Sequence, residues 1–290
     1  MIRRSLKSLW YRISSRSPRV VLGALFLRLA PRSFVEQVYG HFLPGTQSPG
    51  FVTACIRAEL NRRYYALGEV ERRRLNRGTL WGGVAGKRWH DAKRDLYQDG
   101  SALQTIRAPL VSQITNFLAD SGAGYHTICE IGAGHGLFLG YLASIAPQGI
   151  ASFIGIDLNG DQVRENNEVY GPSGLTFIHS DVIGWVTERP LTGTCFVSCG
   201  TFECFSEPEL RDFLAAVRLN GKPVAIALME PVTMDLTSEV ASRPRGDIMY
   251  SHNYPYLFTE YGFRIYRQVV RPIDPNIPFY DLVVMLACID

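Results

Sequence analysis

From residue 127 onward, short apolar segments alternate with segments of helical periodicity, and this alternation restricts the possible folds more than any other feature. Seven segments have the length and apolar composition of strands: 127–131, 152–157, 175–179, 194–199, 224–229, 263–270 and 282–289. Apolar strands separated by helices are typical of parallel sheets that are buried on both faces. The pattern therefore predicts an α/β fold with a doubly wound, mostly parallel seven-stranded sheet.

The last two predicted strands are connected differently from the others. Residues 271–281 between them contain Pro272, Pro275 and Pro278 and show no helical pattern. Parallel neighbours need a long crossover, usually a helix, whereas antiparallel neighbours need only a turn. We therefore expect a C-terminal antiparallel hairpin at one edge of the sheet.

The length of the chain indicates one main domain with additional segments. Its 290 residues exceed the usual domain size of roughly 100–200 residues. Residues 1–40 are basic and partly apolar, residues 41–104 show helical patterns broken by glycines, and residues 105–290 contain the strand–helix alternation. We expect residues 41–104 to cover a bound ligand or to recognise a substrate.

Residues 1–35 contain eight basic residues and no acidic one. The apolar run that ends before Arg28 is far shorter than the roughly 20 residues that span a bilayer. Three interpretations stay open: an amphipathic segment on an anionic membrane surface, which we favour, an organellar transit peptide, and a helix packed on the protein. The net charge of only +3 argues against a nucleic-acid partner.

The six cysteines lie mostly in apolar, strand-like segments. Their spacing matches neither a disulfide framework nor a zinc site, so we expect no metal. Buried free cysteines are typical of a reducing compartment. We therefore predict a cytoplasmic protein, peripheral on the membrane if residues 1–35 bind lipid and organellar if they are a transit peptide.

An acid and three alternating glycines directly follow the first predicted strand. Glu130 precedes Gly132, Gly134 and Gly136, and a helix is expected over 137–145. Glycines let a turn adopt left-handed backbone angles and let a ligand touch the backbone. The stretch therefore predicts a strand-to-helix turn that holds a nucleotide-like cofactor.

Two further acids follow the next predicted strands. Asp157 ends the second strand about 20 residues after the glycine turn, where a carboxylate can accept hydrogen bonds from both ribose hydroxyls. Asp181 follows the third strand. For each acid, the alternative role is that of a helix cap.

These features together resemble the class I S-adenosylmethionine-dependent methyltransferases, and the similarity covers residues 127–289. The resemblance implies a Rossmann-like fold, enzymatic activity and S-adenosylmethionine as cofactor. It also implies that the three glycines pass under the methionine and ribose parts and that Glu130 neighbours the methionine amino group. Asp157 would then bind the ribose, and Asp181 the adenine amino group.

A nicotinamide dinucleotide is the competing cofactor, because an acid ends the second strand in that class too. The dinucleotide fingerprint requires a glycine three residues after Gly134, and this chain has Leu137 there. The sequence therefore favours the methyl donor.

The methyl acceptor is expected beside the segment after the fourth predicted strand, residues 198–205. This segment lacks the Asp/Asn-Pro-Pro-aromatic motif of the related enzymes that methylate amino groups of nucleic acids, and it lacks the strand-end acid of magnesium-dependent catechol enzymes. The remaining interpretation is metal-independent O-methylation of a small molecule or a sugar or glycan. Glu203 is the nearest charged residue and a candidate catalytic group.

The connection over residues 230–258 shows too little helical pattern for its length, which predicts a lid or binding loop. It contains His252, whose ordinary pKa near neutrality suits a general base. Asn253 and Tyr254 follow it and are candidates for orienting the acceptor. The run from His252 to Pro255 is also similar to bacterial sugar O-methyltransferases.

Two other functions remain open. An RNA or protein methyltransferase would use the basic residues near the N-terminus to bind its polymer. A non-catalytic scaffold would bind S-adenosylmethionine without turnover.

Overall fold

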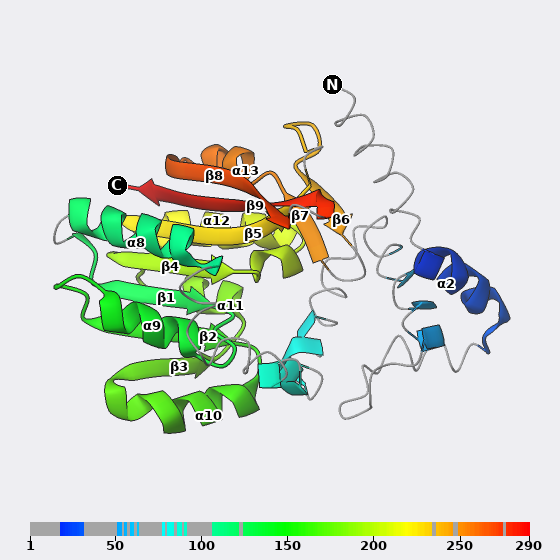
Figure 1. The fold of residues 1–290 in the computed structure, drawn as a ribbon, viewed down its shortest axis with the longest axis horizontal. Coiled ribbons are helices and arrows are strands. Elements are labelled where there is room, and N and C mark those ends of the chain that lie inside the picture. Colours follow the sequence, from blue (N-terminus) through cyan, green and yellow to red (C-terminus); the bar gives the residue numbers. More distant parts are fainter. Residues whose placement is uncertain are drawn as a thin grey trace.

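The computed structural model describes residues 18–31, 51–53, 55–56, 59–60, 63, 77–78, 80–83, 86–88, 90–91, 106–121, 124–233, 236–245, 249–274 and 277–290. Within these ranges, a seven-stranded sheet has the strand order β3-β2-β1-β4-β5-β9-β8. Figure 1 shows this sheet with helices packed against it on both faces. The predicted α/β fold is therefore confirmed.

Five neighbouring strands of this sheet are parallel. They are β1 (Thr127–Ile131), β2 (Ser152–Asp157), β3 (Leu175–His179), β4 (Thr194–Cys199) and β5 (Val224–Val232). The chain starts at β1, adds β2 and β3 on one side, and then returns to add β4 and β5 on the other. In open α/β sheets, ligands bind at such a switch point, outside the carboxyl ends of the strands.

The predicted antiparallel hairpin closes one edge of the sheet. β9 (Ile277–Ile289) pairs antiparallel with both β5 and the outermost strand, β8 (Arg264–Asp274). Both strands extend further into the proline-rich residues than the sequence pattern predicts. Pro272 is tolerated because it lies on the edge strand, where its missing N–H removes no hydrogen bond between inner strands of the sheet.

Two layers of helices cover the sheet. One layer contains α8 (Ala108–Asp120), α9 (Leu137–Ile145) and α10 (Gly160–Tyr170), and the other contains α11 (Val182–Thr187), α12 (Glu207–Asn220) and α13 (Tyr254–Glu260). Short 3₁₀ turns lie at Gly171–Ser173 (η2) and Phe202–Cys204 (η3). α12 begins with a capping box, in which Ser206 and Glu209 each bond the backbone N–H of the other.

The connection after β5 is not the irregular loop that the sequence pattern predicts. It contains a two-stranded hairpin, β6 (Ser242–Arg245) and β7 (Met249–His252), and then α13. α13 has only seven residues, too few to show a clear 3.6-residue period. Its buried side chains Tyr254, Leu257 and Phe258 belong to the main apolar cluster, so this part of the connection is core.

The N-terminal part of the described chain contains α2 (Pro18–Leu29). Phe26, Leu27 and Ala30 pack on Ile56 and Leu60. No helix in the described ranges is long and apolar enough to cross a membrane. Residues 1–17 and the predicted boundaries near residues 40 and 104 lie outside the described residues.

Candidate functional site

A cavity of about 630 Å³ lies at the carboxyl ends of β1, β2, β4 and β5. Its lining brings together most of the site residues that the sequence indicates: Glu130, Gly132, Gly134, Asp157, Asp181 and Glu203. Arg77, Trp81 and His90 from the N-terminal region also line it. The carboxyl ends of the parallel strands therefore converge on this cavity, as their topology predicts.

The glycine turn has the backbone conformation that its sequence suggests. Gly132 and Gly134 have φ angles of 69° and 50°, in the left-handed region that side chains disfavour. A Cβ atom on Gly132 would collide with the side chain of Thr201, and one on Gly134 would lie 3.0 Å from Nδ1 of His90. The turn therefore presents bare backbone to the cavity. Gly136 lies behind the turn as the N-cap of α9.

Glu130 is a buried carboxylate beside this turn, with only 3% of its surface exposed. Within the described part of the chain, its Oε2 atom has no hydrogen-bond partner. Burial raises the pKa of Glu130 to about 8, although the nearby charge of Arg107 lowers it. The Arg107 guanidinium lies 4.3 Å from the centre of the Phe138 ring and also lines the cavity. A buried acid and a cation thus lie at one end of the site.

Asp157 connects the end of β2 to the glycine turn. Its Oδ2 accepts a hydrogen bond from the Gly134 N–H at 2.8 Å, and its Oδ1 accepts one from the Asn159 N–H at 2.8 Å. The N-cap of α10 is Asn159, whose side chain accepts from the Gln162 N–H. A carboxylate can accept about four hydrogen bonds, so Asp157 keeps acceptor capacity for a ligand in the cavity that it lines.

Asp181 is both a helix cap and a cavity residue. Its Oδ1 accepts from the Ile183 N–H at 2.9 Å, which caps α11. Its Oδ2 accepts from Nη2 of Arg77 at 3.0 Å. The same Arg77 guanidinium lies 3.2 Å from Glu209 and stacks 4.3 Å from the centre of the Phe205 ring. The capping role is therefore present, and the adenine contact stays a prediction.

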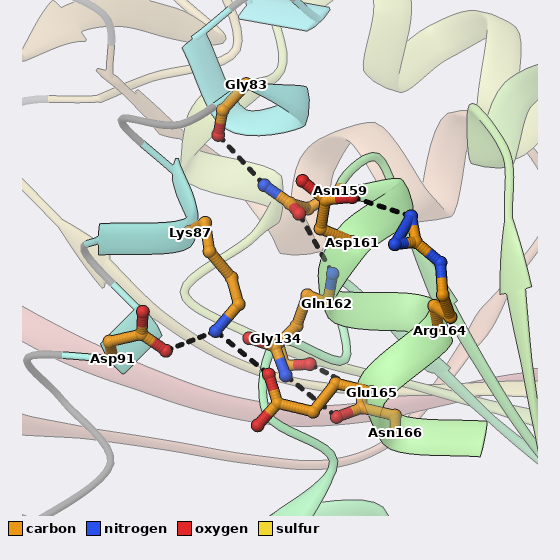
Figure 2. Close-up of polar contacts among 10 residues, drawn as sticks. All are labelled: Gly83, Lys87, Asp91, Gly134, Asn159, Asp161, Gln162, Arg164, Glu165 and Asn166. Atoms are coloured by element: carbon orange, nitrogen blue, oxygen red, sulfur yellow. Dashed lines mark hydrogen bonds and ion pairs between the residues drawn. The ribbon is translucent and has the colours of Figure 1, made fainter. Parts of the chain in front are cut away.

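Trp81 and His90 line one side of the cavity, and neighbouring residues of their segment make polar contacts with α10 and the residue that precedes it (Figure 2). The Asn159 side-chain amide donates to the carbonyls of Trp81 and Gly83 at 3.0 and 2.9 Å. Lys87 forms ion pairs with Glu165 on α10, at 2.9 Å, and with Asp91. These contacts hold the described residues of this segment against α10, and a role in covering a ligand or recognising a substrate stays a prediction.

The other side of the cavity is formed by the segment after β4, where Glu203 is located. Glu203 forms an ion pair with Arg245 of β6. The backbone of this segment is held by Glu230, a fully buried residue near the end of β5. The lining near this end also includes apolar side chains from β5, β7, β8 and β9: Met229, Pro231, Met249, Pro272 and Leu282.

His252, Asn253 and Tyr254 are not among the residues that line this cavity. The side chain of His252 is buried, with Nδ1 2.6 Å from Oγ of Ser242 and Nε2 3.0 Å from the Phe205 carbonyl. Asn253 caps α13, and Tyr254 packs against the Phe202 ring. The geometry therefore separates these three candidates from the cavity, because they lie on core elements and not on a lid.

Two residues that line the cavity carry no clear signal in the sequence. Arg77 lies in the N-terminal region and Arg107 directly precedes α8, and both reach the cavity only through the tertiary fold. Glu230 directly follows the predicted strand 224–229, so the criterion that selects Asp157, an acid after a predicted strand, also applies to it. Across the described ranges, no group of three or more His, Cys, Asp or Glu residues is placed to hold a metal ion.

No family model matches the sequence, and no curated protein is found as a relative. Among solved structures, magnesium protoporphyrin IX methyltransferase from Synechocystis PCC 6803 with bound S-adenosylmethionine is similar over 75% of this chain and 97% of that chain, at 17% identity and a TM-score of 0.50. The same enzyme with bound S-adenosylhomocysteine covers 75% and 99%, at 18% identity and a TM-score of 0.50. An S-adenosylmethionine-dependent methyltransferase from Aquifex aeolicus covers 60% and 88%, at 19% identity and a TM-score of 0.42.

The similarity to the Synechocystis enzyme identifies the fold of this chain as that of the class I S-adenosylmethionine-dependent methyltransferases. The family resemblance that the sequence suggests is therefore confirmed at the level of the fold.

Proposed function

We propose that the protein is an enzyme that transfers a methyl group from S-adenosylmethionine, without a metal ion, to a hydroxyl group of a small molecule or of a sugar or glycan. The observation that supports this best is the carboxylate of Glu130, which is buried beside the glycine turn. Its Oε2 atom has no hydrogen-bond partner among the described residues. Burial raises the pKa of Glu130 to about 8, so its ionised form needs a partner of opposite charge, and the ammonium of the cofactor would supply one.

The other groups of the cavity fit the remaining parts of the cofactor. Arg107 is a cation close enough to influence the pKa of Glu130, and it suits the methionine carboxylate. Asp157 has acceptor capacity for ribose hydroxyls, and Asp181 is our candidate for the adenine amino group. The Synechocystis enzyme with the same fold was crystallised with S-adenosylmethionine and with S-adenosylhomocysteine.

When bound, the cofactor supplies a methyl group activated by a positively charged sulfur. Transfer of this methyl group would need the acceptor oxygen in line with the carbon–sulfur bond, whose electron pair would stay on sulfur. The protein mainly positions the acceptor in line and removes the proton of its hydroxyl group. Glu203 lines the cavity near the apolar lining residues, and we infer that it receives this proton.

The acceptor side combines apolar and charged side chains. Met229, Met249 and Leu282 line it, together with two prolines, Glu203 and Arg271. Such apolar side chains pack on the flat face of an aromatic ring or on the C–H face of a sugar. This lining favours a small ring-shaped acceptor over an extended polymer.

The cofactor assignment is tested by calorimetry on two matched variants. Asp157→Ala removes a carboxylate that lines the cavity, whereas Asp161→Ala removes an exposed carboxylate from α10. Loss of charged hydrogen bonds should weaken S-adenosylmethionine binding about 10- to 100-fold in Asp157→Ala. Asp161→Ala should bind like the wild type. Equal affinity in all three proteins would exclude the proposed ribose site.

The acceptor class is tested with a labelled methyl donor offered to glycans, small phenols, lipids and RNA. We expect transfer to a ring-bearing small molecule or sugar. Transfer to RNA with steep salt dependence would instead support a nucleic-acid methyltransferase. Cofactor binding without transfer to any class would support a non-catalytic scaffold.

We also propose that residues 1–35 attach the protein to an anionic membrane surface, with the protein in the cytoplasm. The supporting observation is the apolar stripe of α2, in which Val21, Leu25 and Leu29 are 56%, 49% and 73% exposed. These residues are four positions apart and share one helix face. The eight basic residues of this segment match the charge of anionic lipids.

Vesicle sedimentation tests the membrane proposal with anionic and with neutral phosphatidylcholine vesicles. The wild type should sediment with anionic vesicles only. Replacing Val21, Leu25 and Leu29 by Ser should reduce this sedimentation, and deleting residues 1–35 should abolish it, with cofactor binding unchanged. Equal sedimentation of the full-length and shortened chains would contradict the proposal.

A further inference from the structure

The last residue of β4 and the residues that follow it, 199–205, form one wall of the cavity and are here called the acceptor loop. This loop contributes most of its residues to the lining: Cys199, Gly200, Thr201, Glu203, Cys204 and Phe205. After β4 ends, its only regular secondary structure is one 3₁₀ turn at Phe202–Cys204. Its conformation must therefore depend on contacts with the elements around it.

Glu230 binds the N–H groups of the acceptor loop from the side of β5. Its Oε1 accepts hydrogen bonds from the Thr201 and Phe202 N–H groups, both at 3.1 Å, and from Oγ of Ser198 at 2.7 Å. Its Oε2 accepts from the Glu203 N–H at 3.2 Å. One fully buried carboxylate thus binds three consecutive backbone N–H groups at the start of the 3₁₀ turn.

His252 binds the other end of the acceptor loop from the side of β7. Its Nε2 lies 3.0 Å from the Phe205 carbonyl. A carbonyl can only accept, so Nε2 must carry the proton and donate it. In the neutral ring, Nδ1 is then an acceptor, and Oγ of Ser242 donates to it at 2.6 Å. The Phe205 carbonyl therefore fixes the tautomer of His252, and the Ser242 hydroxyl supplies the donor that Nδ1 accepts in this tautomer.

The acceptor loop also touches the glycine turn. A Cβ atom on Gly132 would collide with the side chain of Thr201, so the two segments are in close contact only because position 132 has no side chain. Glu230 holds the Thr201 N–H at this contact. The position of the acceptor loop is therefore linked to the position of the glycine turn.

We propose that Glu230 and His252 are a pair of positioning residues that hold the acceptor loop against the glycine turn. Glu230 binds backbone N–H groups of the loop, and His252 binds the Phe205 carbonyl. Neither side chain is among those that line the cavity, so both act through the loop that they bind. This role rests on the proposed methyl transfer, because the loop matters for function only if an acceptor binds beside it. It replaces the interpretation of His252 as general base.

Hydrogen–deuterium exchange tests the pair in the full-length protein without an acceptor. Glu230→Gln keeps the size of the side chain but replaces one accepting oxygen by an NH₂ group, which faces the Glu203 N–H. Exchange of amides 201–203 should become about tenfold faster or more in this variant, since local opening becomes easier. The exposed Glu168→Gln on α10 is the control and should exchange at the wild-type rate. Unchanged protection in Glu230→Gln would overturn the proposal.

Two variants of His252 separate positioning from catalysis. His252→Gln offers an amide N–H to the Phe205 carbonyl but accepts no proton, whereas His252→Leu offers no donor. With an acceptor from the labelled-donor screen, His252→Gln should keep kcat within about threefold of the wild type, and His252→Leu should raise the acceptor KM about tenfold or more. Loss of kcat of about 100-fold in His252→Gln, with the loop still protected, would restore the role of general base.

The proposed methyl transfer and the positioning role of Glu230 and His252 can be refuted separately. If the wild type neither binds S-adenosylmethionine nor transfers its methyl group, the proposed function is wrong. If the wild type is active and the variants of Glu230 and His252 match it in exchange and in acceptor KM, only the positioning role is wrong. If Glu230→Gln does not fold, Glu230→Asp, which keeps the charge but shortens the side chain, is used for the same comparison.

Discussion

Acidification from pH 7 to pH 5 should destabilise the protein by about 2 kcal/mol through His252 alone. Burial, aided by the charge of Arg245, lowers the pKa of this imidazole from 6.5 to about 4, against the opposite effect of its carbonyl partners. The unfolded chain therefore takes up a proton below pH 6.5, whereas the folded chain does so only near pH 4. Between these two pH values, proton uptake by His252 favours the unfolded state. The contribution of neutral His252 to the stability of the folded protein is therefore complete above pH 6.5 and is lost as the pH falls towards 4.

Urea unfolding at both pH values measures this effect, if the wild type is compared with His252→Gln. The comparison is needed because two buried acids act in the opposite direction. Burial raises the pKa of Glu130 to about 8 and that of Glu230 to about 7. Their protonated forms are favoured in the folded state, so both acids make the protein more stable as the pH falls. Subtracting the variant from the wild type removes their contribution.

The wild type should lose about 2 kcal/mol more than His252→Gln between pH 7 and pH 5. A variant at an exposed histidine, His126→Gln, should behave like the wild type. A difference below about 0.5 kcal/mol between the wild type and His252→Gln would refute the argument, because such a small difference falls within ordinary surface effects. It would mean that His252 is reached by water in the folded protein.

Two further substitutions test other contacts of the site. Gly132→Ala places a Cβ against Thr201 at a φ of 69°, so it should lower the free energy of unfolding by about 1–3 kcal/mol and weaken cofactor binding; an unchanged unfolding temperature and affinity would contradict this. Arg77→Met removes the cation that Asp181 and Glu209 share. The free energy of unfolding, measured with urea, should therefore fall by about 3 kcal/mol. A cost below about 1 kcal/mol would show that water replaces the guanidinium.

Much of the fold could be predicted because local patterns repeat along the chain. The strands β1 to β4 and the helix α9 have the predicted bounds, since short apolar runs between turn residues leave few alternatives. The capping box of α12 is equally local. α13 was not predictable, because a seven-residue helix that begins with Tyr254 and Pro255 is too short for a periodic signal.

The candidate site could be predicted where one segment contains both the turn and its ligand-facing groups. Glu130, Gly132 and Gly134 lie within five residues of each other, and all three line the cavity. His252 shows the limit of this approach. Its side-chain chemistry suits a base, but solvent access decides whether that chemistry is available, and burial is not visible in a local pattern.

The sequence by itself determined the α/β architecture, the C-terminal hairpin and the glycine turn with its acid, because each depends on backbone preferences and on spacing within one or two elements. Only the tertiary structure decided which distant groups meet at that turn. Arg77 reaches Asp181 across 104 positions of sequence, and Glu230 and His252 reach the acceptor loop from β5 and β7. Such contacts depend on how the strands and helices pack, and the separation of two residues along the sequence does not tell how far apart they lie in the folded protein.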